Sequence, residues 1–330
     1  MKKTVFYFTC LLLITLVIFS CKKGGIKGIK VDKFSNGKAG EVILILDKKY
    51  SSEATQNYIE ETLTQPQPAL NQIEPMFNLL HFENKDFTSQ FQRHRNIVQF
   101  DMNENYASNT FSIEVNVWAR PQTHVYFRGN SMDSLLLLFQ QHENIIINSL
   151  YENDLKRVQY YASQNNDSYI EKKIKEKFSI HITVPNTYKI AREEDDFMWL
   201  RFKTVRNDRF IIIYKTEGND LSKQGLIETR NAMTKAYIPG SVSGAYPVVA
   251  EVHPFPLYNE NVKVGATIGA ELRGLWESVG DKMGGPFYNY SFIDKTGENV
   301  VAIDGFVYAP EEEKRDYLRE VEAIVKSVRY

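Results

Sequence analysis

The distribution of cysteine constrains this chain more than any other feature of its sequence. The 330 residues include only two cysteines, Cys10 and Cys21, so no thiol follows residue 21. The rest of the chain therefore has no residue for a disulfide, a thiolate nucleophile or a Cys-ligated metal. A chain of this length must be stabilised by burial of an apolar core, and its 43% hydrophobic residues can supply one.

The charge balance excludes one large class of partners. The chain has 40 Lys+Arg and 41 Asp+Glu, which gives a formal net charge of −1. A broad nucleic-acid surface requires a basic excess, so we expect no nucleic-acid partner. The overall composition is that of a folded soluble protein and argues against a disordered chain or a polytopic membrane protein.

The first twenty residues have the pattern of a secretory signal peptide. Lys2 and Lys3 precede an uncharged stretch over residues 5–19. This stretch is short for a membrane-spanning helix, which needs ~20 apolar residues, and it matches the apolar part of a signal peptide. Removal of residues 1–20 would also remove two lysines and leave Cys21 as the only cysteine.

The end of this segment resembles the lipobox of bacterial lipoproteins. Ile18, Phe19, Ser20 and Cys21 supply an aliphatic residue, a spacer, a small residue and the cysteine. The resemblance implies cleavage before Cys21, attachment of acyl chains such as palmitate, and an address at the periplasmic face of the outer membrane. Two or more chains hold a protein stably at a bilayer. The alternative is an ordinary cleaved signal with an incidental cysteine.

The remaining chain predicts an α+β protein with two mixed sheet-and-helix units. Residues 21–40 are rich in glycine and lysine and indicate a lipidated tether, residues 41–170 a first unit, and residues 171–330 a second. The second half resembles PsbP-like α/β sandwiches.

Apolar periodicity and capping residues define the expected elements. Ser52 and Asn130 are the expected N-caps of two helices, and Pro310 is the expected start of the last helix. Strands are expected at 41–47, 76–82, 97–102, 111–118, 124–128, 178–184, 197–203, 210–215, 248–253, 288–294 and 300–308, and helices at 52–63, 131–163, 168–177 and 222–236.

The sequence contains no recognisable cofactor or metal motif. Its six histidines have no metal-ligand spacing, and there is neither a Walker A loop nor a strand–GxGxxG–helix arrangement. We therefore expect no metal and no cofactor, and the catalytic residues, if there are any, stay unknown.

The glycine-rich segment 265–290 contains the densest set of candidate binding residues. Its candidates are Glu271, Arg273, Trp276, Glu277, Gly284 and Gly285. As a binding cleft, the tryptophan would stack on a ring or sugar face and the arginine would hold an anion. The two glutamates would also suit acid–base hydrolysis of a glycan. The alternative is a buried Arg–Glu pair and a core tryptophan below a tight turn.

Two Trp–Arg pairs with a spacing of two residues form a second candidate set. Trp118 precedes Arg120 and Trp199 precedes Arg201 in the same way. On a strand this spacing puts both side chains on one face, where the guanidinium can stack near the ring. Structural cation–π packing and an anion site are both compatible with this pattern.

The motifs together are similar to those of a Bacteroidota lipoprotein family that is described as a domain of unknown function. The similarity extends over about residues 34–328 and is carried by residues 95–96 (RN), 118–122 (WARPQ), 197–201 (FMWLR), 273–277 (RGLWE) and 283–287 (MGGPF). It implies a cell-envelope location, and it brings no activity and no catalytic residue.

These observations favour a lipid-anchored periplasmic binding or scaffold protein over an enzyme. Its partners would be the membrane, through the anchor, and an envelope protein or glycan. The rival hypotheses are an envelope glycan hydrolase using Glu271 and Glu277, and an accessory lipoprotein of outer-membrane assembly. The ligand and the oligomeric state stay open.

Overall fold

The structure is a computed structural model that describes residues 33–330. These residues belong to one compact unit, Val31–Tyr330. The predicted signal peptide, the lipidation site Cys21 and the tether up to residue 32 lie outside the described residues.

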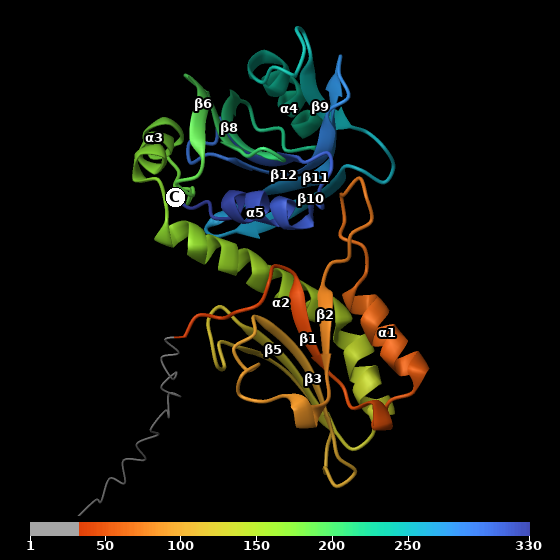
Figure 1. Cartoon of the computed structure of the whole chain (residues 1–330). Coiled ribbons are helices and arrows are strands. Elements are labelled where there is room, and N and C mark those ends of the chain that lie inside the picture. The colour runs from red at the N-terminus through yellow and green to blue at the C-terminus, as the bar shows by residue number, and fades with distance from the viewer. Residues whose placement is uncertain (1–32) are drawn as a thin grey trace, which may run out of the picture. The chain divides into compact units, whose positions relative to one another are not determined.

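The N-terminal region is built on a five-stranded mixed sheet with the order β2-β1-β3-β5-β4 (Figure 1). Four of the strands run parallel to one another, and β4 is antiparallel to β5 at one edge. The strands are β1 (Glu41–Ile45), β2 (Asn78–Phe82), β3 (Asn96–Met102), β4 (Thr110–Val115) and β5 (Thr123–Gly129), with short 3-10 helices at Lys48–Tyr50 and Asn84–Asp86.

Two helices, α1 (Glu53–Leu63) and α2 (Met132–Gln164), cover one face of this sheet. Ser52 caps α1 as expected, because its hydroxyl accepts the N–H of Thr55. The cap of α2 is Ser131, whose hydroxyl accepts the N–H of Ser134, and the prediction of Asn130 was wrong by one residue.

The C-terminal region contains an eight-stranded sheet with the order β10-β11-β12-β13-β8-β7-β6, and β9 pairs with β11. All of its pairs are antiparallel. The strands are β6 (Lys189–Glu194), β7 (Phe197–Lys203), β8 (Asp208–Glu217), β9 (Tyr246–Ala250), β10 (Leu257–Val264), β11 (Thr267–Val279), β12 (Gly284–Ile293) and β13 (Asn299–Tyr308).

Helices cover both faces of this larger sheet. On one face, α3 (Ser168–Phe178) and α5 (Arg315–Val325) enclose a core with Tyr288 and Ile303. On the other face, α4 (Lys223–Tyr237) packs over a second core that contains Trp276 and Phe306. The region is therefore an α/β sandwich, and the predicted α+β class is confirmed.

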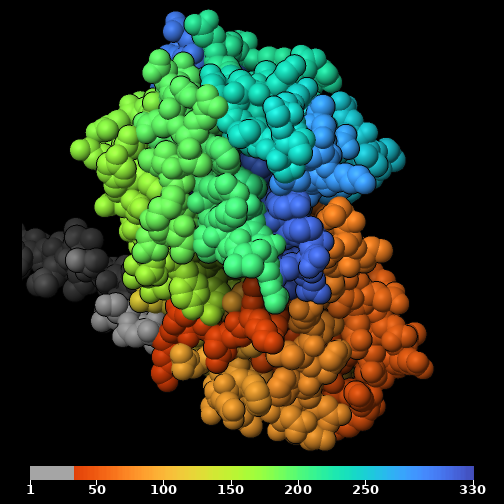
Figure 2. Space-filling view, turned by 45° about the horizontal axis from the view of Figure 1, so that its top comes forward, coloured from red at the N-terminus to blue at the C-terminus, as the bar shows by residue number. Residues whose placement is uncertain are grey.

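The helix α5 also contacts α2, so that it belongs to the interior of both regions (Figure 1). In the space-filling view, the red and orange N-terminal segments lie directly against the green and blue C-terminal region (Figure 2). Glu74 explains part of this contact, since its carboxylate accepts the N–H of Lys314 at 2.7 Å and of Arg315 at 2.8 Å. The last helix therefore begins at Arg315, and the prediction of a start at Pro310 was wrong.

Other expected elements also differ from the structure. Residues 178–184 end α3 and continue as a buried segment with one isolated bridge, from His181 to Arg329, in place of a strand. The strand expected at 111–118 ends at Val115, because Asn116 has a left-handed φ of 57°. The sequence analysis also expects no strand within residues 265–287, where the long strand β11 lies.

Residues 34–40, which the sequence analysis assigns to the tether, pack against the N-terminal region. Ser35 is 2% exposed, and Phe34 and Asn36 form isolated bridges with Arg120 and His94. Within residues 33–330, no helix combines the length and apolarity needed to cross a membrane.

Candidate functional site

The structure divides the candidates of the glycine-rich segment between the two faces of β11. Trp276 joins the core below α4, whereas Arg273 approaches α5 on the opposite face. This separation follows from the alternation of side chains along a strand, because the two positions are three residues apart. The expected cleft that contains both residues is therefore not formed.

The two glutamates are also far from one another. Glu271 and Glu277 lie six positions apart on the continuous strand β11, which is about 20 Å at ~3.3 Å per residue. Glycosidase carboxylates lie roughly 5–9.5 Å apart. Glu271 instead accepts hydrogen bonds from the Tyr288 hydroxyl and the Asn259 amide. The structure does not assemble the predicted acid–base pair.

Arg273 forms a structural ion pair at the junction of the two regions. Its Nη2 atom lies 2.6 Å from Oε1 of Glu322, whose side chain is fully buried on α5. The Tyr151 hydroxyl on α2 donates to the other carboxylate oxygen of Glu322. Burial raises the pKa of Glu322, but the positive charges of Arg273 and Lys326 outweigh it and lower that pKa to about 2.

The glycines of the MGGPF motif allow close packing of the backbone. A Cβ atom on Gly285 would lie 2.1 Å from the carbonyl oxygen of Val307, and one on Gly284 would lie 2.9 Å from that of Trp276. Without a side chain at Gly285, the indole of Trp276 crosses β12 and donates from Nε1 to the Val307 carbonyl at 3.0 Å. The RGLWE and MGGPF motifs therefore take part in the same packing contact, because Gly285 leaves the space that the indole of Trp276 occupies.

The first Trp–Arg pair does not lie on a strand. Trp118 follows the end of β4, where its ring packs 6.1 Å from that of Phe87 and 5.0 Å from that of His124. Arg120 is exposed. Stacking of Arg120 on Trp118 would require both residues to lie on one strand. The strand β4 ends before them, at Val115, and the chain turns at Asn116.

The second pair lies on β7 and meets Trp276 in one cavity. Arg201 holds its guanidinium carbon 5.9 Å from the centre of the Trp199 ring. The cavity has a volume of about 340 Å³. We call it the Trp199 cavity; it is lined by Trp199, Arg201, Lys203, Asp208, Phe210, Ile238, Pro239, Gly240, Ser241, Pro247, Trp276, Ser278, Met283 and Phe306.

Four aromatic rings form a continuous row along the Trp199 cavity. The ring of Phe210 lies 5.9 Å from that of Trp199 and stacks 4.5 Å from that of Phe306. The row ends at Trp276, whose ring meets Phe306 edge-on at 5.6 Å. Gly285 of β12 has no side chain that would interrupt this row. The four rings, which come from β7, β8, β13 and β11, therefore form one apolar wall.

The charged groups of the cavity lie at its β7–β8 side. Arg201 donates to both carboxylate oxygens of Asp208, from Nε at 3.2 Å and from Nη2 at 2.7 Å. Lys203 is exposed and forms no ion pair within residues 33–330. Nearby, Asp281 holds the Ser241 loop in place: burial raises its pKa, but N–H groups of Met283 and Ser241 lower it to about 2.

One polar group of the cavity lining has no partner among the described residues. Trp199 is 8% exposed, and its indole Nε1 makes no hydrogen bond. The indole of Trp276, in contrast, is satisfied by Val307. A buried N–H group without an acceptor costs about 1–3 kcal/mol, so Trp199 is a locally unfavourable part of the cavity lining.

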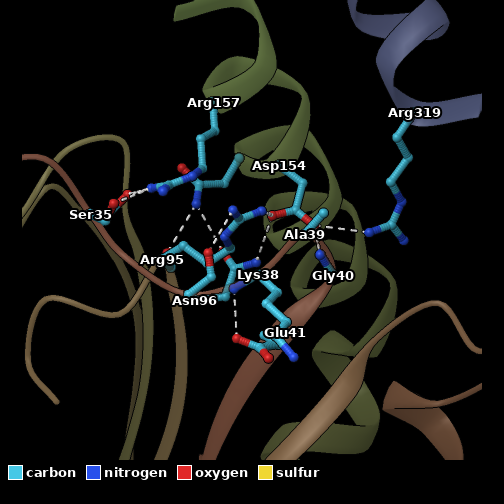
Figure 3. Close-up of polar contacts among 12 residues, drawn as sticks. Ser35, Lys38, Ala39, Gly40, Glu41, Arg95, Asn96, Asp154, Arg157 and Arg319 are labelled. Carbon is cyan, nitrogen blue, oxygen red and sulfur yellow. Dashed lines mark hydrogen bonds and ion pairs between the residues drawn. The ribbon is translucent and has the colours of Figure 1, made fainter. Parts of the chain in front are cut away.

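A buried polar centre with a different role lies around Asp154 of α2 (Figure 3). Asp154 is 2% exposed, and its two oxygens accept from Arg95 at 3.0 Å and Arg319 at 2.9 Å. They also accept from the Gly40 N–H and the Asn96 amide. Since Arg319 comes from α5 and Arg95 from the start of β3, this carboxylate joins the two regions.

A third arginine of this centre holds the segment before β1 (Figure 3). Arg157 donates to the carbonyl and hydroxyl oxygens of Ser35, and its guanidinium carbon lies 4.4 Å from the centre of the Phe34 ring. Burial, followed by the nearby charge of Arg95, lowers the pKa of Arg157 to about 10. The arrangement holds Phe34 and Ser35 against α2.

Sequence reasoning identified Trp199, Arg201 and Trp276 but missed their common cavity and the whole Asp154 centre. The partners of Asp154 are 58 to 165 residues away in sequence, which leaves no local signal. Among residues 33–330, no group of three or more His, Cys, Asp or Glu side chains is placed to hold a metal ion.

Comparisons with known proteins find regions of unknown function and slight structural likenesses. The chain matches no curated protein. A mutant form of the protein Mog1 is similar with a TM-score of 0.31 and 12% identity over 46% of this chain and 89% of that one. A protein from Bacteroides thetaiotaomicron VPI-5482 gives a TM-score of 0.26 and 9% identity over 46% of this chain and 44% of that one.

Two family models match the sequence side by side. Residues 35–162 match the domain of unknown function DUF8532, and residues 167–327 match the domain of unknown function DUF4837. The chain therefore consists of two regions that each match a family of unknown function.

Proposed function

We propose that the protein is a lipid-anchored binding protein of the cell envelope and that its ligand occupies the Trp199 cavity. The observation that supports this most strongly is a cavity that combines an aromatic wall with the cationic side chains of Arg201 and Lys203. Small-molecule sites are mostly apolar, have volumes of ~300–1,000 Å³ and contain a few polar groups that orient the ligand. The Trp199 cavity has all three features.

The envelope location in this proposal depends on the leader and on Cys21. The uncharged stretch 5–19 and the lipobox-like end at Cys21 are the supporting observations. A binding function is favoured over glycan hydrolysis because the two candidate glutamates lie about 20 Å apart along β11.

The cavity part of the proposal is tested by following indole N–H signals in an NMR titration. Trp118→Phe leaves Trp199 and Trp276 as the only two tryptophans, and both line the cavity. Naphthalene-2-carboxamide, a flat uncharged probe, is expected to shift the Trp199 signal in a saturable way. Absence of any saturable shift from this probe and from its carboxylate and amine analogues would overturn the proposal.

A pair of serine variants controls for binding elsewhere. Ser241 and Ser243 are both exposed in the loop between α4 and β9, and only Ser241 lines the cavity. Ser241→Phe is expected to fill the opening and abolish the titration, whereas Ser243→Phe leaves it unchanged. Equal behaviour of the two variants would place the probe outside the Trp199 cavity.

A further inference from the structure

One positive charge at the Trp199 cavity, that of Lys203, is not paired with a negative side chain of the cavity lining. Of its lining residues, only Arg201, Lys203 and Asp208 carry charge at neutral pH. Asp208 neutralises Arg201 through two hydrogen bonds, and its side chain is only 11% exposed. Lys203 is therefore the charge that a ligand can meet, on a protein whose formal net charge is −1.

Arg201 retains hydrogen-bonding capacity beside this lysine. Its Nε and Nη2 atoms donate to Asp208, while Nη1 makes no hydrogen bond with the described residues. The Arg201 side chain is 34% exposed, so this atom is accessible to an acceptor. Residues 201 and 203 lie on the same face of β7 as Trp199, because side chains alternate along a strand.

Along β7, Trp199 of the aromatic wall is followed by the charged side chains of Arg201 and Lys203. The row of rings from Trp199 to Trp276 offers apolar surface made largely of ring edges, because Phe210 and Phe306 stack on one another, and an aromatic ring can pack edge-to-face against it. Arg201 and Lys203, further along β7, favour a negative group at one end of the ligand.

We infer that the ligand class is a planar ring compound with a single negative charge, such as a carboxylate. Its ring lies against the aromatic wall, and its anionic group meets Lys203 and Nη1 of Arg201. This inference rests on the proposed function, because it specifies the chemistry of the molecule that the same cavity takes.

Three probes of nearly equal shape test this charge preference. They are naphthalene-2-carboxylate, naphthalene-2-carboxamide and 2-naphthylmethylamine, which carry one negative charge, no charge and one positive charge. In Trp118→Phe protein, affinities read from the Trp199 indole signal are expected to decrease in that order. Equal affinities, or tightest binding of the amine, would overturn the inferred class while the proposed binding function stands.

Substitution of Lys203 tests whether this lysine causes the preference for the negatively charged probe. Lys203→Gln is expected to weaken the carboxylate by about twofold to fivefold, since an exposed charge contributes up to ~1 kcal/mol, and to leave the amide unchanged. Lys263→Gln is the matched control, because Lys263 is exposed on β10 outside the cavity lining. A carboxylate affinity that is equal in the two variants would contradict the role of Lys203.

Discussion

Replacement of a single buried charge is expected to lower the stability of this protein strongly, because such a charge contacts several helices and strands at once. Asp154 receives four donors from the segment before β1, the start of β3 and α5. Removal of one member of such a cluster leaves arginines without compensation in the interior, which costs more than the loss of a surface pair.

For Asp154→Asn, we expect the free energy of unfolding to fall by about 3–5 kcal/mol, because Arg95 and Arg319 would lose their carboxylate partner. Urea denaturation followed by circular dichroism gives the measurement. The matched control is Glu152→Gln on the same helix, whose side chain is 49% exposed and pairs with Lys326. Its loss is expected to stay below about 1 kcal/mol; similar losses in both variants would contradict the role of Asp154.

His124 is expected to make stability depend on pH. It is 5% exposed, its Nε2 lies 3.1 Å from the Gln99 amide oxygen, and burial lowers its pKa to about 4. In the unfolded chain the pKa is about 6.5. The contribution of His124 to the free energy of unfolding is therefore complete above pH ~6.5 and is lost as the pH falls toward 4, because only the unfolded state binds the proton in this window.

Between pH 7 and pH 5 this linkage amounts to about 2 kcal/mol. His124→Gln is expected to flatten the stability profile by that amount, as measured by urea denaturation at a series of pH values. The exposed His81 gives the control variant His81→Gln. An unchanged profile in His124→Gln would show that folding does not shift the pKa of His124.

At the scale of elements, local signals predicted most helices and strands, and long-range contacts decided the rest. Ser52 caps its helix as the sequence pattern indicates, and Ser222, the first residue of the helix expected at 222–236, is the N-cap of α4. The strand β11 was missed because Gly269 and Gly274 are typical of a loop. A Cβ atom on Gly269 would lie 2.1 Å from the carbonyl oxygen of Ser291, so this glycine serves close strand packing instead.

The start of α5 depends on a residue that is far away in sequence. Glu74 is 4% exposed and accepts the N–H groups of Lys314 and Arg315. Glu74→Gln removes the charge next to the helix N-terminus and one acceptor, so we expect a loss of about 1–2 kcal/mol. Thermal denaturation gives the comparison with Glu311→Gln, which changes an exposed residue of the preceding turn; equal stability of the two variants would contradict the capping role.

At the scale of the whole molecule, the sequence predicts a lipid anchor at Cys21. The structure describes the folded residues 33–330 that this anchor would hold at a membrane. Residues 34–40 pack on the N-terminal region, and residues 22–33 separate them from Cys21 in the sequence. The α+β class followed from apolar periodicity alone. The meeting of Trp199, Arg201 and Trp276 could not be predicted, because it requires the pairing order of β7, β8, β13 and β11.

The two cysteines provide a direct test of the anchor. Cys21→Ala is expected to move the protein from the membrane pellet to the soluble fraction, since the acyl chains would have no attachment point. Cys10→Ala lies in the predicted signal peptide and is expected to remain in the pellet. Immunoblots of fractionated cells give the comparison, and a Cys21→Ala protein that stays with the membrane would contradict lipid anchoring at this residue.

The claim that the Trp199 cavity is a ligand site is tested most directly by a crystal structure with naphthalene-2-carboxylate. We expect electron density for the ring along Trp199, Phe210, Phe306 and Trp276, with the carboxylate at Lys203. Density for the probe only at other surfaces, with the Trp199 cavity filled by water, would contradict it.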